Sequence, residues 1–216
     1  MRVVIAGGHG KIALLLEERL SARGDQPVGI VRNPDHAADL GSRGAEAVVL
    51  DLERASVDEL ADVVRGADAV VFAAGGGPGS GVARKETVDK GAAILLADAA
   101  ERAGVSRYLM VSSMGTDQAD PDSDDVFQVY LRAKAAADAD LRSRDLDWTI
   151  VQPGRLTDGP GTGQVSLDPA AEPREIPRAD VAHALEAALD RPATFRKQFT
   201  LLSGSVPIEE AYVDLP

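Results

Sequence analysis

The feature that most constrains the fold of this chain is an alternation between short apolar runs and longer segments of helical periodicity. The apolar runs are rich in Val and Ile, whereas the segments between them repeat apolar residues every three or four positions. This alternation is typical of β-α-β units, in which helices cover a buried parallel sheet. The runs predict about seven strands, at Val3–Ala6, Pro27–Val31, Ala45–Leu50, Ala69–Ala73, Arg107–Val111, Trp148–Gln152 and Gln198–Leu202.

Helices are predicted between these strands, at Lys11–Arg23, Ser56–Arg65, Thr87–Ala103 and Val126–Leu141. Crossovers between parallel strands are right-handed, so the expected fold class is α/β, a doubly wound parallel sheet with helices on both faces, known as the Rossmann fold. Ligands of such sheets bind outside the carboxyl ends of the strands. Functional residues are therefore expected at those ends.

The length of the chain, 216 residues, is that of one α/β domain, and we find no internal repeat or interdomain linker. We predict a single domain, with a small substrate-side region from about 153 to 216. Two glycine- and proline-rich stretches predict loops beside the crevice. The first, Gly75–Gly81, should be mobile, and the second, Gly154–Pro177, should hold one short strand at Gln164–Leu167.

The composition excludes several classes of partner. The chain has 23 basic and 35 acidic residues, a net charge of −12, and this charge opposes binding to nucleic acid or to an anionic membrane. It has no cysteine and three scattered histidines, so no metal site is expected. No apolar run suits a signal peptide or a membrane span, which favours a cytoplasmic location. A monomer and a homodimer both stay open.

A G-x-x-G-x-x-A pattern joins the first predicted strand to the first helix. Gly7 permits a tight turn, Gly10 lets backbone amides at the helix N-terminus approach a pyrophosphate, and Ala13 lets the helix pack closely on the strand. An ordinary β-to-α turn is the alternative. We predict a dinucleotide site with contacts from Gly7, Gly8, His9, Gly10, Lys11 and Ile12.

Arg32 follows the second predicted strand, where an NAD-binding protein places an acidic residue for the ribose 2′-hydroxyl. A guanidinium there suits the 2′-phosphate of NADP(H), which we predict is preferred over NAD(H). Alternatively, Arg32 is a solvated residue at a turn, and Asp51 is a cap for the turn that follows it. The predicted contacts at the ends of the second, third and fourth strands are Arg32, Asn33, Asp51, Leu52, Ala73, Ala74 and Gly75.

Tyr130 and Lys134 lie one turn apart on an apolar stripe of the helix predicted at Val126–Leu141. A buried unpaired ammonium is costly, so Lys134 should pair or face a cavity. Its charge should lower the pKa of Tyr130 and make the phenol a general acid/base. Ser112 and Ser113 end the fifth strand, where their hydroxyls could hold a carbonyl oxygen. The alternative is a core tyrosine, a snorkelling lysine and two capping serines.

Together these motifs resemble the atypical short-chain dehydrogenase/reductase family. The residues that carry the resemblance are Gly7-x-x-Gly10-x-x-Ala13, Arg32-Asn33-Pro34, Val111-Ser112-Ser113, Tyr130-x-x-x-Lys134, Leu146–Leu156 and Leu202-Ser203-Gly204. The resemblance implies a Rossmann domain that binds NADP, with Lys134 also touching the cofactor. It further implies nicotinamide-side contacts at Pro153, Gly154, Arg155 and Leu156. Asp89 matches an Asp of the subgroup and is a further catalytic candidate.

These observations predict an NADP(H)-dependent oxidoreductase or epimerase-like enzyme that acts on a small carbonyl or hydroxyl compound. Tyr130 would be the general acid/base and Lys134 would assist it. A non-catalytic NADP(H) sensor is one alternative, favoured by the lack of a substrate domain and by Met114 after the two serines. A reductase of a flavin or a linear tetrapyrrole is another, because it needs little more than an open pocket over the nicotinamide.

Overall fold

The computed structural model describes residues 1–77, 79–213 and 215. The predicted parallel strands are confirmed with small shifts of their ends. They are β1 (Arg2–Ala6), β2 (Gln26–Val31), β3 (Glu46–Val49), β4 (Ala69–Phe72), β5 (Arg107–Val111), β6 (Asp147–Pro153) and β10 (Lys197–Ser203). The α/β Rossmann class is therefore confirmed.

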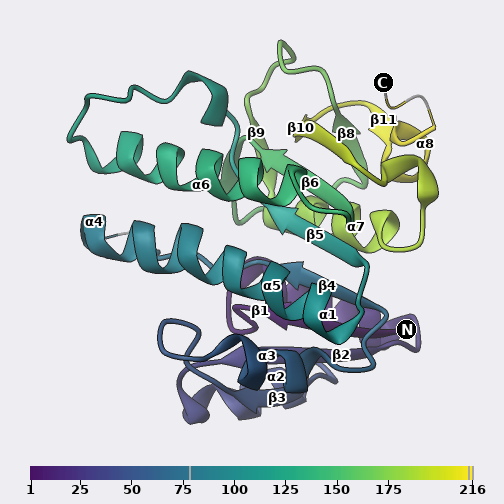
Figure 1. Cartoon of the computed structure of the whole chain (residues 1–216). Helices are drawn as coiled ribbons and strands as arrows, with labels where there is room; N and C mark the ends of the chain where they lie inside the picture. The colour runs from purple at the N-terminus through teal and green to yellow at the C-terminus, as the bar shows by residue number, and fades with distance from the viewer. Residues whose placement is uncertain (78, 214, 216) are drawn as a thin grey trace.

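Two further strands extend this sheet beyond the predicted number. β8 (Gln164–Ser166) pairs antiparallel with β10, and β11 (Val206–Pro207) pairs antiparallel with β8. The sheet of the described residues therefore has nine strands, in the order β11-β8-β10-β6-β5-β4-β1-β2-β3 (Figure 1). The prediction of a short strand at Gln164–Leu167 is confirmed. The two residues of β11 are too few to show a periodicity.

The stretch predicted as a loop at Gly154–Pro177 is more regular than expected. Besides β8 it contains β7 (Arg155–Thr157) and β9 (Glu175–Pro177), which pair in parallel as a separate small sheet. Each strand has only three residues, so their pairing depends on a contact between segments that lie far apart in the sequence. The hydrophobic pattern of either segment alone does not predict it.

Alternate residues of the central strands point into two apolar cores, one on each face of the sheet. One face is covered by α1 (Lys11–Ala22) and α7 (Arg178–Ala188), whose leucines and alanines pack on Val3, Ile5 and Val71. The other face is covered by α3 (Val57–Val64), α5 (Ala93–Ala103) and α6 (Val126–Arg142). Figure 1 shows α5 and α6 side by side on that face. The strand order reverses between β1 and β4, and a crevice is expected there.

The helix predicted at Thr87–Ala103 starts earlier than its apolar pattern indicates. It begins with α4 (Gly81–Arg84), continues through π-helical turns at Lys85–Ala92 and ends as α5 (Figure 1). The π-helical turns bury Lys85 and Asp89 beside Val88 and Ala92. These two buried polar residues interrupt the apolar pattern from which a helix is predicted. The predicted loop at Gly75–Gly81 is correspondingly shorter, and Pro78 within it lies outside the described residues.

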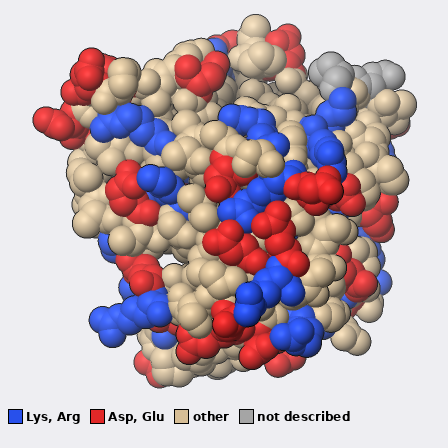
Figure 2. Space-filling view, in the orientation of Figure 1, with Lys and Arg blue, Asp and Glu red and all other residues tan. Residues whose placement is uncertain are grey.

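The remaining helices are short and lie at the periphery. They are α2 (Ala37–Ser42), α8 (Ile208–Ala211) and 3-10 turns at Pro34–His36, Thr116–Gln118 and Pro192–Thr194. No helix in the described part of the chain is long and apolar enough to cross a membrane. On the face drawn in Figure 2, basic and acidic side chains are interspersed. The described residues form many ion pairs, such as those of Arg144 with Asp98, Glu101 and Asp140.

Candidate functional site

A cleft of about 330 Å³ opens at the carboxyl ends of β1 to β4, where the strand order reverses. Most of the predicted cofactor contacts line it, namely Gly7, His9, Gly10, Arg32, Asn33, Asp51, Leu52, Ala73, Ala74 and Gly75. The sequence did not single out the other lining residues, which are Ile30, Val31, His36, Leu50, Glu53, Arg84 and Val88. The predicted contacts that lie outside this lining are Gly8, Lys11, Ile12, Lys134, Pro153, Gly154, Arg155 and Leu156.

The glycine turn is fixed by steric constraints on the backbone. Gly7 has φ +84°, and a Cβ at this position would lie 2.6 Å from Cα of Ala74. The Gly10 amide donates to the Gly7 carbonyl at 2.8 Å, and Gly10 precedes α1 without a side-chain cap among the described residues. The first amides of a helix have no partner within the helix and carry partial positive charge. This turn therefore fits the pyrophosphate of a dinucleotide.

Gly8 faces the interior rather than the cleft. Its amide donates to the Ile30 carbonyl at 2.9 Å, and a Cβ at Gly8 would lie 2.7 Å from Cα of Gly29. The Glu17 side chain is fully buried beside these glycines, and its carboxyl oxygens have no hydrogen-bond partner within the described residues. Burial raises the pKa of Glu17 to about 8, against the opposing charge of Arg43. No motif in the sequence indicated this carboxyl group beneath the turn.

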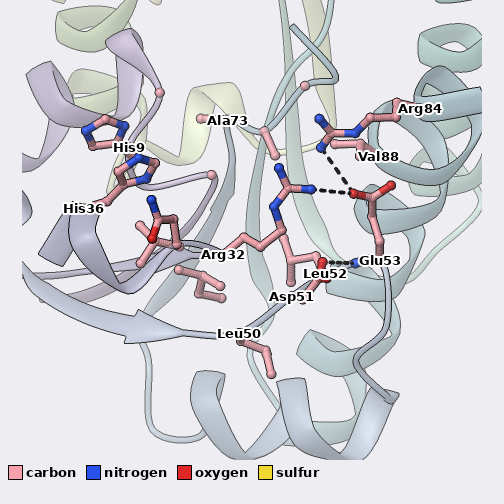
Figure 3. A pocket seen from close by; sticks show the side chains of 17 residues that line it. His9, Arg32, His36, Leu50, Asp51, Leu52, Glu53, Ala73, Arg84 and Val88 are labelled. Carbon is pink, nitrogen blue, oxygen red and sulfur yellow. Dashed lines mark hydrogen bonds and ion pairs between the residues drawn. The ribbon is translucent and has the colours of Figure 1, made fainter. Parts of the chain in front are cut away.

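Charged residues from the end of β2, the turn after β3 and the end of α4 meet at one side of the cleft (Figure 3). Arg32 after β2 and Arg84 at the end of α4 each place a guanidinium nitrogen 3.2 Å from Oε2 of Glu53. Thr87 donates its hydroxyl to the other Glu53 oxygen at 2.7 Å. Asp51 accepts the Glu53 amide at 3.1 Å, so Asp51 caps the turn, as the alternative interpretation expected, while it also lines the cleft.

The two basic side chains of the glycine turn diverge. The imidazole of His9 stacks on that of His36 with centroids 3.6 Å apart and meets Asp39 at 2.7 Å, and both histidines line the cleft (Figure 3). Lys11 instead reaches Asp158 at 2.7 Å. The Lys11 ammonium therefore lies beside a different group of residues from those of the cleft. Ile12 packs its side chain in the core.

The apolar stripe of α6 is shorter than predicted, because Val126 is exposed. Lys134 is buried on the remaining stripe, and its ammonium donates to the Val111 carbonyl at 2.8 Å and lies 5.1 Å from the centre of the Phe72 ring. The expectation that Lys134 must pair is therefore met by a backbone carbonyl. Burial lowers the pKa of Lys134, and the nearby carboxylates Asp89 and Asp138 oppose that shift.

The prediction that Tyr130 has a lowered pKa is wrong for this structure. Burial raises the pKa of Tyr130 to about 12, Asp89 and Asp138 raise it further, and the Ser113 hydroxyl acts in the opposite direction. The Lys134 ammonium does not offset the burial, since it is directed to the Val111 carbonyl. Tyr130 is therefore a neutral phenol near pH 7.

A second lysine, which the sequence did not single out, lies over the Tyr130 ring. The Lys85 ammonium is 5.3 Å from the centre of the Tyr130 ring. It donates to the Gly77 carbonyl at 3.2 Å and lies 3.9 Å from Asp89. Asp89 is buried and accepts the Gly76 amide at 3.0 Å. Lys85 and Asp89 thus anchor the loop after β4 to the π-helical turns.

The two serines after β5 have different surroundings. Ser112 is buried and donates its hydroxyl to Asp138 at 2.6 Å, and burial raises the pKa of Asp138. Ser113 is half-buried, with its hydroxyl beside the Tyr130 phenol. Of the two candidate serines, the geometry therefore groups Ser113 with Tyr130.

The segment after β6 is held by its backbone. The Pro153 carbonyl accepts the Met114 amide at 3.0 Å, and the Gly154 amide donates to the Leu201 carbonyl at 3.1 Å. A Cβ at Gly154 would lie 2.4 Å from the Leu202 side chain. Arg155 is exposed and pairs with Glu175. Leu156 is half-buried against the core formed with α1 and α7.

No group of three or more His, Asp or Glu side chains among the described residues could hold a metal ion. The cleft instead offers arginines, histidines and glycine amides to a ligand. The adjacent end of α6 offers a neutral phenol. Of the groups that such residues bind, an anionic dinucleotide fits both the glycine turn and the two arginines.

Comparison with known proteins agrees with this assessment of the site. Residues 7–192 match a family model described as NAD(P)H-binding. The chain is 35% identical to the uncharacterized sugar epimerase YhfK of Bacillus subtilis, over 98% of both chains. A solved structure from Bacillus halodurans, provisionally named a NAD-dependent epimerase/dehydratase, is 38% identical, with a TM-score of 0.92 and 100% of both chains covered. The anaerobilin reductase ChuY of Escherichia coli O157:H7 is 25% identical, with a TM-score of 0.78, 95% of this chain and 98% of that one covered.

Proposed function

This chain belongs to the family of NAD(P)H-binding proteins, and we propose that it is an NADP(H)-dependent reductase or epimerase of a small carbonyl or hydroxyl compound. The observation that carries the proposal is the cleft, which combines an uncapped helix N-terminus behind the glycine turn with arginines at the ends of β2 and α4. We also infer that the protein is of the atypical short-chain dehydrogenase/reductase type. The grouping of Ser113 after β5 with Tyr130 and Lys134 of α6 supports this assignment.

The preference for NADP(H) over NAD(H) rests on Arg32. Its guanidinium lines the cleft directly after β2, where the adenosine ribose of a dinucleotide binds in this fold. A phosphate on that ribose would gain charge-assisted hydrogen bonds from the guanidinium. The unphosphorylated ribose offers only a hydroxyl, which Arg32 binds less strongly.

In the proposed reaction, Tyr130 donates a proton to the substrate oxygen. A phenol with a pKa of about 12 is fully protonated near pH 7, so it can act as an acid without prior activation. Ser113 would position the same oxygen, and Lys134 would hold the end of β5 in place through the Val111 carbonyl. Bound NADPH would supply the hydride. This arrangement favours the direction of reduction.

Reduction of a linear tetrapyrrole is a second candidate. The observation that favours it is the similarity to the anaerobilin reductase over nearly the whole of both chains. Such a substrate needs an open pocket and a hydride donor, and depends less on a tyrosine acid. Turnover of a tetrapyrrole that survives Tyr130→Phe would select this candidate over reduction of a small carbonyl.

The experiment that tests the proposal is calorimetric titration with NADPH and NADH. We expect NADPH to bind more tightly, and Arg32→Ala to weaken NADPH binding by roughly 10-fold to 100-fold, as for loss of a charge-assisted hydrogen bond, with little change for NADH. Arg65→Ala is the matched control, since Arg65 is exposed, lies outside the cleft lining and pairs with Asp62 one turn away. If neither nucleotide binds, the proposal is wrong.

A further inference from the structure

The side chains of two arginines and one glutamate meet at the edge of the cleft (Figure 3). The same carboxylate oxygen, Oε2 of Glu53, lies 3.2 Å from a guanidinium nitrogen of Arg32 and 3.2 Å from one of Arg84. The three residues come from the end of β2, the turn after β3 and the end of α4. A position where two guanidinium groups converge on one anionic oxygen suits a phosphate group.

The donors of this cluster exceed its acceptors. Nε of Arg84 is buried and has no hydrogen-bond partner within the described residues. Two guanidinium groups facing one carboxylate leave a net positive charge. Glu53 is itself held by the Thr87 hydroxyl at 2.7 Å, and its side chain is only 23% exposed. The cluster can therefore accept further negative charge and further acceptor oxygens.

We propose that Arg84 is the second cation of a ribose 2′-phosphate subsite, and that Glu53 sets the choice between the phosphorylated and the unphosphorylated cofactor. This inference rests on the proposed binding of NADP(H). A dianionic 2′-phosphate at this position meets the negative charge of the Glu53 carboxylate, which competes with it for both arginines. A ribose hydroxyl can instead donate to Glu53 where it stands. Glu53 therefore weakens NADPH binding and reduces the preference that the two arginines would otherwise give.

The variant Glu53→Gln tests the competition, because it keeps the size of the side chain and a hydrogen-bond acceptor for Thr87 while removing the charge. We expect NADPH, and the fragment 2′,5′-ADP, to bind roughly fivefold to tenfold more tightly, the factor for release of one or two exposed ion pairs. The affinities for NADH and 5′-AMP should stay the same or fall. Glu86→Gln is the matched control, since Glu86 is exposed, lies outside the cleft lining and pairs with Lys90.

The variant Arg84→Ala tests the subsite independently of Glu53. We expect it to weaken NADPH and 2′,5′-ADP binding selectively, and the double variant to lose the gain of Glu53→Gln. Circular dichroism spectra and melting curves check that each variant is folded. If Glu53→Gln and Arg84→Ala change NADPH and NADH affinities by the same factor, or change neither, the inference is wrong while NADP(H) binding stands. If the parent protein binds neither nucleotide, the proposed function fails first.

Discussion

The two ends of the candidate site differ in the interactions that hold their residues in place. The glycine-turn end (Gly7–Gly10, Arg32, Asp51–Glu53 and Ala73–Gly75) is shaped by backbone geometry, since a side chain at Gly7 would collide with Ala74. The Tyr130 end (Lys85, Asp89, Ser113, Tyr130 and Lys134) is shaped by contacts between side chains and distant backbone groups. Local backbone constraints are visible in a sequence motif, whereas the protonation state of Tyr130 depends on burial in the folded chain.

The largest expected effect lies at the Tyr130 end. Tyr130→Phe should lower the rate of carbonyl reduction by roughly 10²-fold to 10⁴-fold, the usual contribution of a positioned acid, and leave NADPH affinity unchanged. The raised pKa of about 12 means that the acidic form persists across the neutral range. The rate should therefore show no Tyr130-dependent fall between pH 6 and pH 9, measured in steady-state assays. A loss of activity with an apparent pKa near 7 that disappears in the phenylalanine variant would contradict this assignment.

At the glycine-turn end, Gly7→Ala should abolish measurable NADPH binding. The new Cβ would lie 2.6 Å from Ala74 in a backbone conformation with φ +84°. Gly24→Ala is the matched control, because Gly24 has φ +86° and nothing within 4 Å of the new Cβ. The control should lose about 1–2 kcal/mol of stability from the left-handed backbone alone and bind NADPH normally. Equal effects of the two variants in titration and urea unfolding would show that the contact with Ala74 is unimportant.

Glu17 is a test of the contrast between the two ends of the site. It is a buried titratable group, yet it lies at the glycine-turn end, which is shaped by backbone geometry. Its folded pKa of about 8 lies above the ordinary value of 4.5, so the folded state holds a proton that the unfolded state releases between these values. The free energy of unfolding should therefore fall as the pH rises from 5 to 8. Glu17→Gln removes this dependence and should be more stable than the parent by about 2–4 kcal/mol at pH 8. Urea unfolding at several pH values measures the free energy of unfolding of both proteins. If the two free energies change in parallel with pH, the prediction is wrong.

The smallest expected effect concerns Arg155. Its guanidinium is exposed and pairs with Glu175, so Arg155→Ala should change stability by less than about 1 kcal/mol. NADPH affinity and the rate of reduction should change by less than about twofold. A larger fall in the rate alone would support the nicotinamide-side contact that the family resemblance implies.

Most residues predicted at the glycine-turn end line the cleft, because those predictions depended on residue types at strand ends, whereas Gly8, Lys11 and Ile12 lie outside the lining. Gly7, Arg32 and Ala73 follow apolar runs that are easily recognised, and parallel strands bring their ends together. The contact of Glu53 with two arginines was not predictable, since it joins the turn after β3 to the end of β2 and to the end of α4.

At the Tyr130 end, the residue types were recognised but their environments were not. The i, i+4 spacing placed Tyr130 and Lys134 on one side of α6, yet the ammonium turns to the Val111 carbonyl. Lys85 was overlooked because π-helical turns do not follow the apolar period that predicts a helix. The chemistry of this end is therefore a property of tertiary structure.

The short strands that finish the sheet also affect how the protein behaves at high concentration. An exposed strand edge can pair with another chain and lead to aggregation. At one edge the outermost strand, β11, has two residues, and one of them, Pro207, has no amide hydrogen to donate. At the other edge β3 has four residues and begins with the charged Glu46. Both edges therefore offer little backbone for a second molecule to extend, which protects the folded chain against edge-to-edge aggregation.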